Sequence, residues 1–224
     1  MTRARLIATR RPRKARAAVI VLHGGGGRRG NMMVRPTQLS VLRMIPIAWR
    51  IALRGRGRVA VYRLLNSSRG WDVQHTPVDD ARWAIAQVGA QLGRELPVGL
   101  VGHSLGGRAA LLAGTDPAVA AVVALNPYLY PSDGRTDLGG TEVLLVHGTA
   151  DRVASPSVAG RVAEMLRART SVRLTWVEGG KHAMLSQHRR FDAAAAEFVT
   201  ARLLDHRIPS PASRPADGPS GYRA

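Results

Sequence analysis

The sequence predicts an α/β protein in which helices cover both faces of a mostly parallel sheet. Short apolar runs rich in valine and leucine recur along the chain, and each ends in glycine, asparagine or a charged residue. Stretches with helical spacing separate these runs, and such alternation is typical of a parallel sheet. The chain has 224 residues, of which 45% are hydrophobic, so it is long enough to bury the core of one domain.

The strands are predicted from the apolar runs. Most of these runs are continuously apolar, which favours strands that are buried on both faces of a sheet. We expect strands at AAVIVL (17–22), RVAVYRLL (58–65), PVGLVG (97–102), VAAVVAL (119–125), EVLLVHG (142–148) and VRLTWVE (172–178).

The helices are predicted from their spacing and their end signals. Pro77, followed by two acidic residues, favours a helix start. Ser155 is a suitable N-cap in front of Pro156, whereas Pro46 should kink or break a helix. We expect helices at 38–54 with a break at Pro46, at 77–96, from Ser104 to Gly114, at 155–169 and at 191–206.

The chain divides into three expected segments: a basic N-terminal segment (1–16), one folded domain (17–206) and a disordered tail rich in Pro, Ser and Gly (207–224). The apolar run at 17–22 is too short for a signal peptide, and no run approaches the roughly 18 residues of a membrane span. We therefore expect a cytoplasmic protein without a transmembrane segment. The absence of cysteine excludes disulfides and thiolate metal sites.

The net charge is +18, from 33 basic and 15 acidic residues. Such a charge could mark a surface for nucleic acid or an anionic membrane. The basic residues are nevertheless spread along the chain, apart from a cluster at 10–16, and no interleaved aromatic residues accompany them. Arginine-biased composition therefore accounts for the charge, and we expect no specific nucleic-acid partner. The sequence does not define the oligomeric state.

The stretch VGHSLGG places Ser104 directly after a predicted strand and directly before a predicted helix. A sharp turn at this point strains the backbone and presents a serine as a nucleophile, provided that the flanking positions are small. Gly102 and Gly106 occupy those positions. The backbone N–H of Leu105 opens the helix and is a candidate donor to an oxyanion.

A serine nucleophile needs a base, and the base needs an orienting acid. Asp151 and His182 each follow a later predicted strand, so the chain supplies serine, acid and base in that order. Asp133 and Asp137 are alternatives for the acid, and His188 is an alternative for the base.

The glycine-rich loop HGGGG follows the strand at 17–22. Gly25 and Gly26 are the candidate second oxyanion donors, because glycines allow backbone N–H groups to approach a bound oxygen closely. A triphosphate-binding loop is excluded because no G-K-[ST] follows, and GHSLGG does not match a dinucleotide motif. His23, His103 and His147 beside these glycines are expected to pack or to form hydrogen bonds.

The motifs HGGGG, GHSLGG, HGTAD and GGKH together resemble those of the α/β-hydrolase superfamily, in particular its small esterase and dienelactone-hydrolase-like members. The resemblance spans roughly residues 17–206. It implies an α/β-hydrolase fold with Ser104 as nucleophile, His182 as general base and then acid, and Asp151 as the orienting acid. It also implies no cofactor and no metal. Since only residues 126–140 could form a lid, we expect a minimal cap or none.

These expectations describe a serine hydrolase that cleaves a small or medium carboxylic ester through an acyl-enzyme. Because the base must be neutral, activity should rise with pH between pH 5 and 8. Tyr128 and Tyr130 follow a strand on the same side and are candidates for the substrate pocket. The alternatives are acyl transfer, cleavage of a thioester, lactone or amide by the same residues, and a non-catalytic ligand-binding protein.

Overall fold

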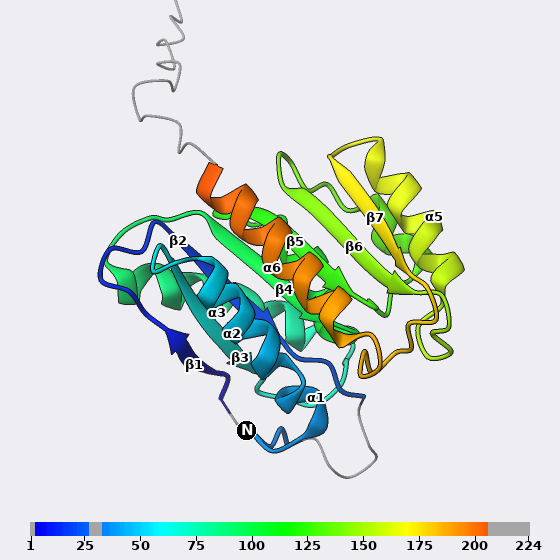
Figure 1. Cartoon of the computed structure of the whole chain (residues 1–224), viewed down its shortest axis with the longest axis horizontal. Coiled ribbons are helices and arrows are strands. Elements are labelled where there is room, and N and C mark those ends of the chain that lie inside the picture. Colours follow the sequence, from blue (N-terminus) through cyan, green and yellow to red (C-terminus); the bar gives the residue numbers. More distant parts are fainter. Residues whose placement is uncertain (1–2, 27–32, 206–224) are drawn as a thin grey trace, which may run out of the picture.

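The computed structural model describes residues 3–26 and 33–205, and its centre is one seven-stranded sheet (Figure 1). The strands lie in the order β1-β3-β2-β4-β5-β6-β7, and every neighbouring pair is parallel except β1 and β3. The α/β prediction and its mostly parallel sheet are confirmed. The strands are β1 (Arg5–Arg10), β2 (Ala17–Leu22), β3 (Val59–Leu65), β4 (Val98–His103), β5 (Val119–Leu125), β6 (Glu142–Gly148) and β7 (Val172–Val177).

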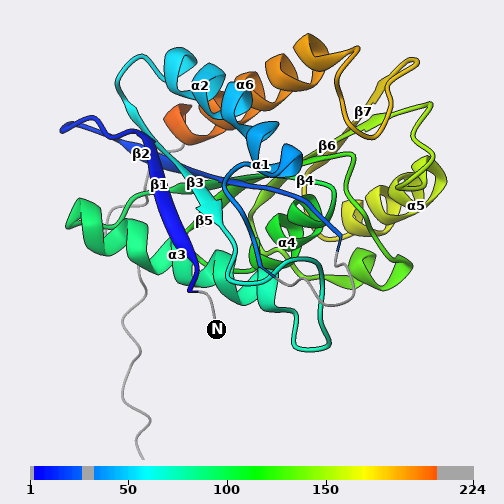
Figure 2. The same cartoon turned by 90° about the horizontal axis from the view of Figure 1, so that it is seen from below.

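Helices cover both faces of the sheet, as the apolar strands require. One buried cluster joins one face of the sheet to α2 and α6, and a second cluster joins the opposite face to α3, α4 and α5 (Figure 2). The helices are α1 (Leu39–Leu42), α2 (Met44–Arg54), α3 (Thr76–Leu92), α4 (Leu105–Ala113), α5 (Pro156–Arg167) and α6 (His188–Asp205), with a short 3-10 helix, η1 (Pro131–Arg135), between β5 and β6.

The sheet extends into the basic N-terminal segment that was expected to precede the domain. Residues Arg5–Arg10 form β1, which pairs antiparallel with β3 at the edge of the sheet. Charged residues at both ends hid this strand in the sequence, because its partly exposed position needs no continuous apolar run. The tail at 207–224 lies outside the described residues.

The predicted helices are present, with changes at their ends. The helical stretch at 38–54 is interrupted at Arg43, not at Pro46, which lies in the first turn of α2, where a missing N–H costs no hydrogen bond. Helix α3 ends at Gly93 in a left-handed conformation. Within residues 3–26 and 33–205, no helix is long and apolar enough to cross a membrane.

The topology places the glycine-rich loop and the three candidate catalytic residues at one edge of the sheet. They follow the carboxyl ends of β2, β4, β6 and β7. In open parallel sheets ligands bind at this edge, beside the point where the strand order reverses, which here is β2. Segments far apart in the sequence therefore meet at one site.

Candidate active site

Ser104 lies on a sharp turn between β4 and α4. Its backbone has φ 56° and ψ −121°, a region that side chains rarely occupy. A Cβ at Gly102 would lie 2.1 Å from the carbonyl oxygen of Gly106, and one at Gly106 would lie 2.4 Å from that of His23. Both positions therefore require glycine, as the sequence predicted.

A chain of hydrogen bonds joins Ser104, His182 and Asp151, and we call it the serine–histidine–aspartate chain. The Ser104 Oγ lies 2.9 Å from Nε2 of His182, and Nδ1 of the same ring lies 2.8 Å from Oδ2 of Asp151. Because a carboxylate only accepts hydrogen bonds, Nδ1 carries the proton of the neutral ring and donates it to Asp151. The free lone pair of Nε2 then faces the serine hydroxyl.

The carboxylate of Asp151 is buried and fully hydrogen-bonded. Its Oδ1 accepts the backbone N–H groups of Val153 and Ala154 at 2.8 and 2.9 Å. Burial by itself would raise the pKa of Asp151, but the hydrogen bonds from His182, Ala154 and Val153 outweigh it and hold the pKa below the usual value. Asp151 is therefore ionised at neutral pH and can orient an imidazole and stabilise its cationic form.

Two buried side chains hold the backbone of His182. Nε2 of His103 donates to the His182 carbonyl at 2.8 Å, and Nδ2 of Asn126 donates to the same oxygen at 3.1 Å and to that of Lys181 at 3.0 Å. Oδ1 of Asn126 accepts the N–H of Gly148, three residues before Asp151. Asn126 thus ties the loop that carries the acid to the loop that carries the base.

His103 is an uncharged hydrogen-bond donor in this arrangement. Burial, followed by the nearby His182, lowers the pKa of His103 to about 4. Its Nδ1 is buried without a partner among the described residues. This agrees with the expectation that His103 packs or forms hydrogen bonds.

The candidate oxyanion donors lie on two segments that meet at Ser104. Leu105 is the first residue of α4, so its N–H has no acceptor within the helix. On the glycine-rich loop, Gly24 is the residue against the serine, since a Cβ there would lie 2.9 Å from Cβ of Ser104. Gly25 lies one residue further on, with φ 128°, and the carbonyl of Gly26 accepts Nε of Arg69 at 3.0 Å.

His23 fixes the start of the glycine-rich loop. Its Nε2 accepts the backbone N–H of Asn66 at 3.2 Å, so Nδ1 carries the proton and donates to the carbonyl of Gly24 at 2.7 Å. Burial lowers the pKa of His23, although the bond to Gly24 opposes the shift. The sequence did not single out Gly24 as the glycine that packs against Ser104, and the only signal for it was its place as the first glycine after the strand.

The alternative acids and base have other partners. Asp133 forms a buried ion pair with Arg108, with oxygen–nitrogen distances of 2.8 and 3.0 Å, and Asp137 accepts the N–H of Gly139. His188 is exposed, and its Nδ1 lies 3.0 Å from the carbonyl of Leu185. None of the three belongs to the serine–histidine–aspartate chain.

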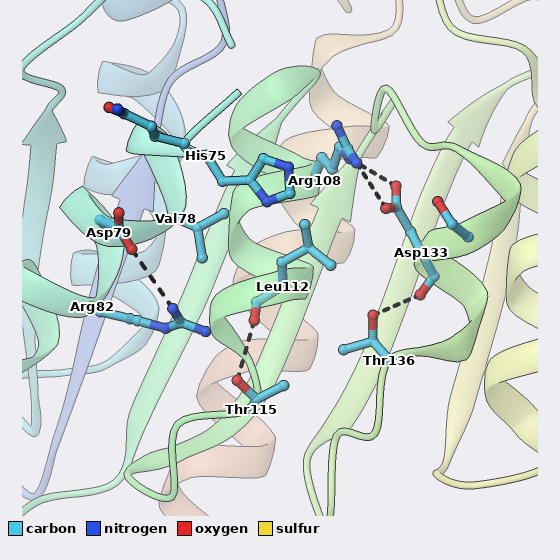
Figure 3. A pocket seen from close by; sticks show the side chains of 11 residues that line it. His75, Val78, Asp79, Arg82, Arg108, Leu112, Thr115, Asp133 and Thr136 are labelled. Carbon is cyan, nitrogen blue, oxygen red and sulfur yellow. Dashed lines mark hydrogen bonds and ion pairs between the residues drawn. The ribbon is translucent and has the colours of Figure 1, made fainter. Parts of the chain in front are cut away.

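A cavity of about 490 Å³ lies between α3, α4 and η1, one helical turn from Ser104 (Figure 3). Arg108 and Asp133 face each other on one wall, and Asp79 pairs with Arg82 on the opposite wall. Ser104, Asp151 and His182 are not among the lining residues. The cavity is therefore separate from the serine–histidine–aspartate chain.

The two candidate pocket tyrosines contact different groups. The N–H of Tyr128 donates to the Ser104 carbonyl at 3.1 Å, and its side chain is partly exposed. The ring of Tyr130 lies on the guanidinium of Arg108, 4.4 Å away, and Trp71 covers the same group at 4.2 Å. Tyr128 lies beside the serine, whereas Tyr130 supports the Arg108–Asp133 pair.

No group of three or more His, Cys, Asp or Glu side chains is arranged to hold a metal ion within residues 3–26 and 33–205.

A comparison with models of protein families identifies the family of this chain. The model of the dienelactone hydrolase family matches residues 63–206, more than half of the sequence. The chain belongs to this family. The match begins within β3, so the glycine-rich loop, α1 and α2 lie outside the matched residues.

Solved structures show that the family's α/β-hydrolase fold covers most of the chain. Esterase Est2 from Thermogutta terrifontis is 18% identical, with a TM-score of 0.68 over 88% of this chain and 89% of that one. Est1E from Butyrivibrio proteoclasticus is 17% identical, with a TM-score of 0.64 over 90% and 94%. A putative hydrolase from Agrobacterium tumefaciens is 15% identical, with a TM-score of 0.69 over 93% and 94%. A comparison with curated protein sequences found no match.

Proposed function

We propose that this protein is a serine hydrolase that cleaves a carboxylic ester of a small or medium molecule through an acyl-enzyme. The observation that carries the proposal is the serine–histidine–aspartate chain, in which each group has the partner and the proton that nucleophilic catalysis needs. Solved structures support the ester as substrate class: Est1E has been determined with ferulic acid bound, and Est2 with propionate and butyrate.

In the proposed reaction Ser104 Oγ attacks the ester carbonyl while His182 Nε2 takes its proton. The resulting imidazolium is stabilised by Asp151, and the tetrahedral oxyanion is held by the N–H of Leu105 and by one from Gly25 or Gly26. His182 then gives its proton to the departing alcohol. Water repeats the same steps on the acyl-enzyme, releasing the acid and restoring the serine.

The nucleophile is tested with a fluorophosphonate probe on the wild type, Ser104→Ala and the control Ser132→Ala, which removes an exposed serine of η1. We expect labelling of the wild type and of the control but not of Ser104→Ala, whose hydrolysis of short-chain esters should fall by about 10⁴-fold or more. A folded wild type that is not labelled would favour a ligand-binding protein without catalysis.

The base is tested by the pH profile of the wild type. Activity on a short-chain ester should rise between pH 5 and 8, because only the neutral imidazole of His182 can accept the serine proton. A flat profile over that range would contradict the assignment of His182 as the base.

A further inference from the structure

The net positive charge of the protein comes almost entirely from the first third of the chain. Basic residues occur throughout, but acidic residues begin only at Asp72. Residues 1–71 contain 17 arginine and lysine residues and no acidic residue, whereas residues 72–224 contain 16 basic and 15 acidic residues. Arginine-biased composition explains many arginines but not this complete absence of acidic residues over 71 positions.

The same part of the chain exposes large apolar side chains on α1, on α2 and just before them. Leu39 is 84% exposed, Leu53 67% and Trp49 49%, and Met33 and Leu42 are also exposed. Single exposed apolar residues are normal, but a group of them on one short segment marks an interaction surface.

Two of these side chains, Trp49 and Leu53, lie on the outer side of α2, whose inner side is already packed. Met44, Ile47 and Ile51 are buried against the sheet and α6. Trp49 and Leu53 are four residues apart and therefore neighbours on the opposite side of α2. We call this surface, formed by Met33, Leu39, Leu42, Trp49, Arg50, Leu53 and Arg54, the α1–α2 face.

Arginine side chains border the apolar residues of the α1–α2 face. Arg50 and Arg54 are exposed, and Arg54 forms an exposed ion pair with Glu197 of α6, with a nitrogen–oxygen distance of 4.0 Å. Asp192, the other acidic residue of α6 that faces α2, is buried and paired with Arg43 at 2.8 Å. The face therefore combines an apolar strip with a positive border.

The α1–α2 face also adjoins the candidate active site. Arg43, between α1 and α2, donates to the carbonyl of Met184, two residues after His182, at 3.3 Å. On the other side, a Cβ at Gly25 would lie 3.2 Å from Oγ of Ser40 in α1. The residue after Met184, Leu185, is 69% exposed.

From this combination we infer that the α1–α2 face binds an anionic lipid surface. Trp and Leu side chains bordered by arginines are the composition of segments that lie in the membrane interface, where the apolar groups enter the acyl boundary and the cations meet lipid phosphates. A second copy of this chain would bring an equally positive face, and a nucleic acid would leave the leucines exposed to water. Resting on the proposed function, lipid binding would bring the serine to esters dissolved in the membrane.

The inference is tested by co-sedimentation of the whole chain with vesicles at about 0.15 M salt. Vesicles of phosphatidylcholine with about 30% phosphatidylglycerol should bind the protein at least about tenfold more tightly than phosphatidylcholine alone. The double variant Trp49→Gln/Leu53→Gln should lose at least about tenfold in affinity, and Arg50→Gln/Arg54→Gln roughly fivefold for each arginine.

The matched control is Val73→Gln/Trp83→Gln, which changes an exposed aliphatic residue and an exposed tryptophan next to and within α3, on the other side of the sheet. Its vesicle affinity should stay within about twofold of the wild type. Unfolding midpoints should confirm that all variants are folded. Any of three results would overturn the inference. The first is an equal loss of vesicle affinity in the control, and the second is no preference for the anionic vesicles. The third is an affinity for duplex DNA that matches the vesicle affinity and is unaffected by Trp49→Gln/Leu53→Gln.

Vesicle binding is measured separately from catalysis, so a failure of the lipid-binding inference can be distinguished from a failure of the proposed hydrolase function. Ser104→Ala should bind the vesicles as the wild type does, even if the serine has no chemical role. If the wild type hydrolyses esters, the ratio of its rate on a long-chain ester held in anionic vesicles to its rate on a water-soluble ester should fall about tenfold in Trp49→Gln/Leu53→Gln. An unchanged ratio would contradict membrane delivery of the substrate.

Discussion

Two buried aspartates, Asp151 and Asp133, lie on neighbouring parts of the molecule and differ in what their partners can do. Asp151 pairs with an imidazole, which can take up and release a proton near neutral pH and whose other nitrogen reaches Ser104. Asp133 pairs with Arg108, which is always protonated and lies between two aromatic rings. A proton can move in the first group, whereas the second group can only hold the structure.

The cavity beside Asp133 and the candidate active site beside Asp151 are also separate places. The 490 Å³ cavity is lined by Arg108 and Asp133, and the hydroxyls of Thr115 and Thr136 in its wall donate to backbone carbonyls. The serine–histidine–aspartate chain lies one helical turn away, and the imidazole of its His182 is partly exposed. The arrangement of proton donors and acceptors, and not the volume of a cavity, thus indicates where chemistry can occur.

The largest expected effect comes from removing the charge of Asp151. In Asp151→Asn the amide can no longer hold the Nδ1–H tautomer of His182, so kcat on a short-chain ester should fall by about 10³–10⁴-fold. Steady-state kinetics measures this effect. Activity within tenfold of the wild type would show that Asp151 does not orient the base.

The second expected effect is on stability. Asp133→Ala leaves the charge of Arg108 buried and unpaired, which should lower the free energy of unfolding by about 3–5 kcal/mol. The kcat of the folded protein should change by less than about threefold, since no group of the serine–histidine–aspartate chain is altered. Urea unfolding and kinetics on the same samples measure the two quantities.

The control is the double variant Arg108→Met/Asp133→Leu, which replaces the whole pair by apolar groups. Its free energy of unfolding should recover to within about 2 kcal/mol of the wild type. A large loss of kcat in either variant would mean that the Arg108–Asp133 pair takes part in the reaction, and the contrast between the two aspartates would fail.

The third expected effect is acid sensitivity from His103. Its pKa is about 4 in the folded protein but 6.5 without the fold, so the unfolded state binds more protons between these values. The free energy of unfolding should therefore fall as the pH drops from 7 to 4, with about 3 kcal/mol of the loss due to His103. His103→Gln keeps a donor for the His182 carbonyl and should remove this part of the pH dependence.

The matched control for His103 is His188→Gln, which changes an exposed histidine. Its unfolding free energy should follow the wild type between pH 7 and pH 4. Equal pH dependence in His103→Gln and the wild type would show that His103 is not held neutral by burial.

The smallest expected effect concerns the substrate pocket. The backbone of Tyr128 bonds to that of Ser104, but no side-chain hydrogen bond joins Tyr128 to the serine–histidine–aspartate chain, so Tyr128→Ala should raise KM by about three- to tenfold and leave kcat nearly unchanged. Tyr130→Ala should instead lower stability, because it uncovers Arg108. A change in kcat for Tyr128→Ala without a change in KM would contradict the assignment of Tyr128 to the substrate pocket.

Local patterns in the sequence were sufficient for most of the fold and for selecting the three side chains that hydrogen bonds join in the structure. Apolar runs located the six parallel strands, and the runs are continuous in strands such as β2 and β4 because burial on both faces leaves no room for polar side chains. The spacing of Gly102, Ser104 and Gly106 predicted the sharp turn because only glycine fits beside it. Asp151 and His182 were selected because each follows a later strand, and parallel strands bring the residues after them to the same edge of the sheet.

Only the tertiary structure decided which groups meet across long distances in the sequence. In the folded chain β1 pairs at the edge of the sheet, and Asn126 and His103 donate to the backbone carbonyl of His182. Asp133 forms an ion pair with Arg108. It also showed that Trp49 and Leu53 face outward although the helical spacing of 38–54 fits a buried helix equally well. Apolar periodicity predicts that a helix has a buried face. Contacts with distant segments of the chain determine which face is buried and what the opposite face contacts.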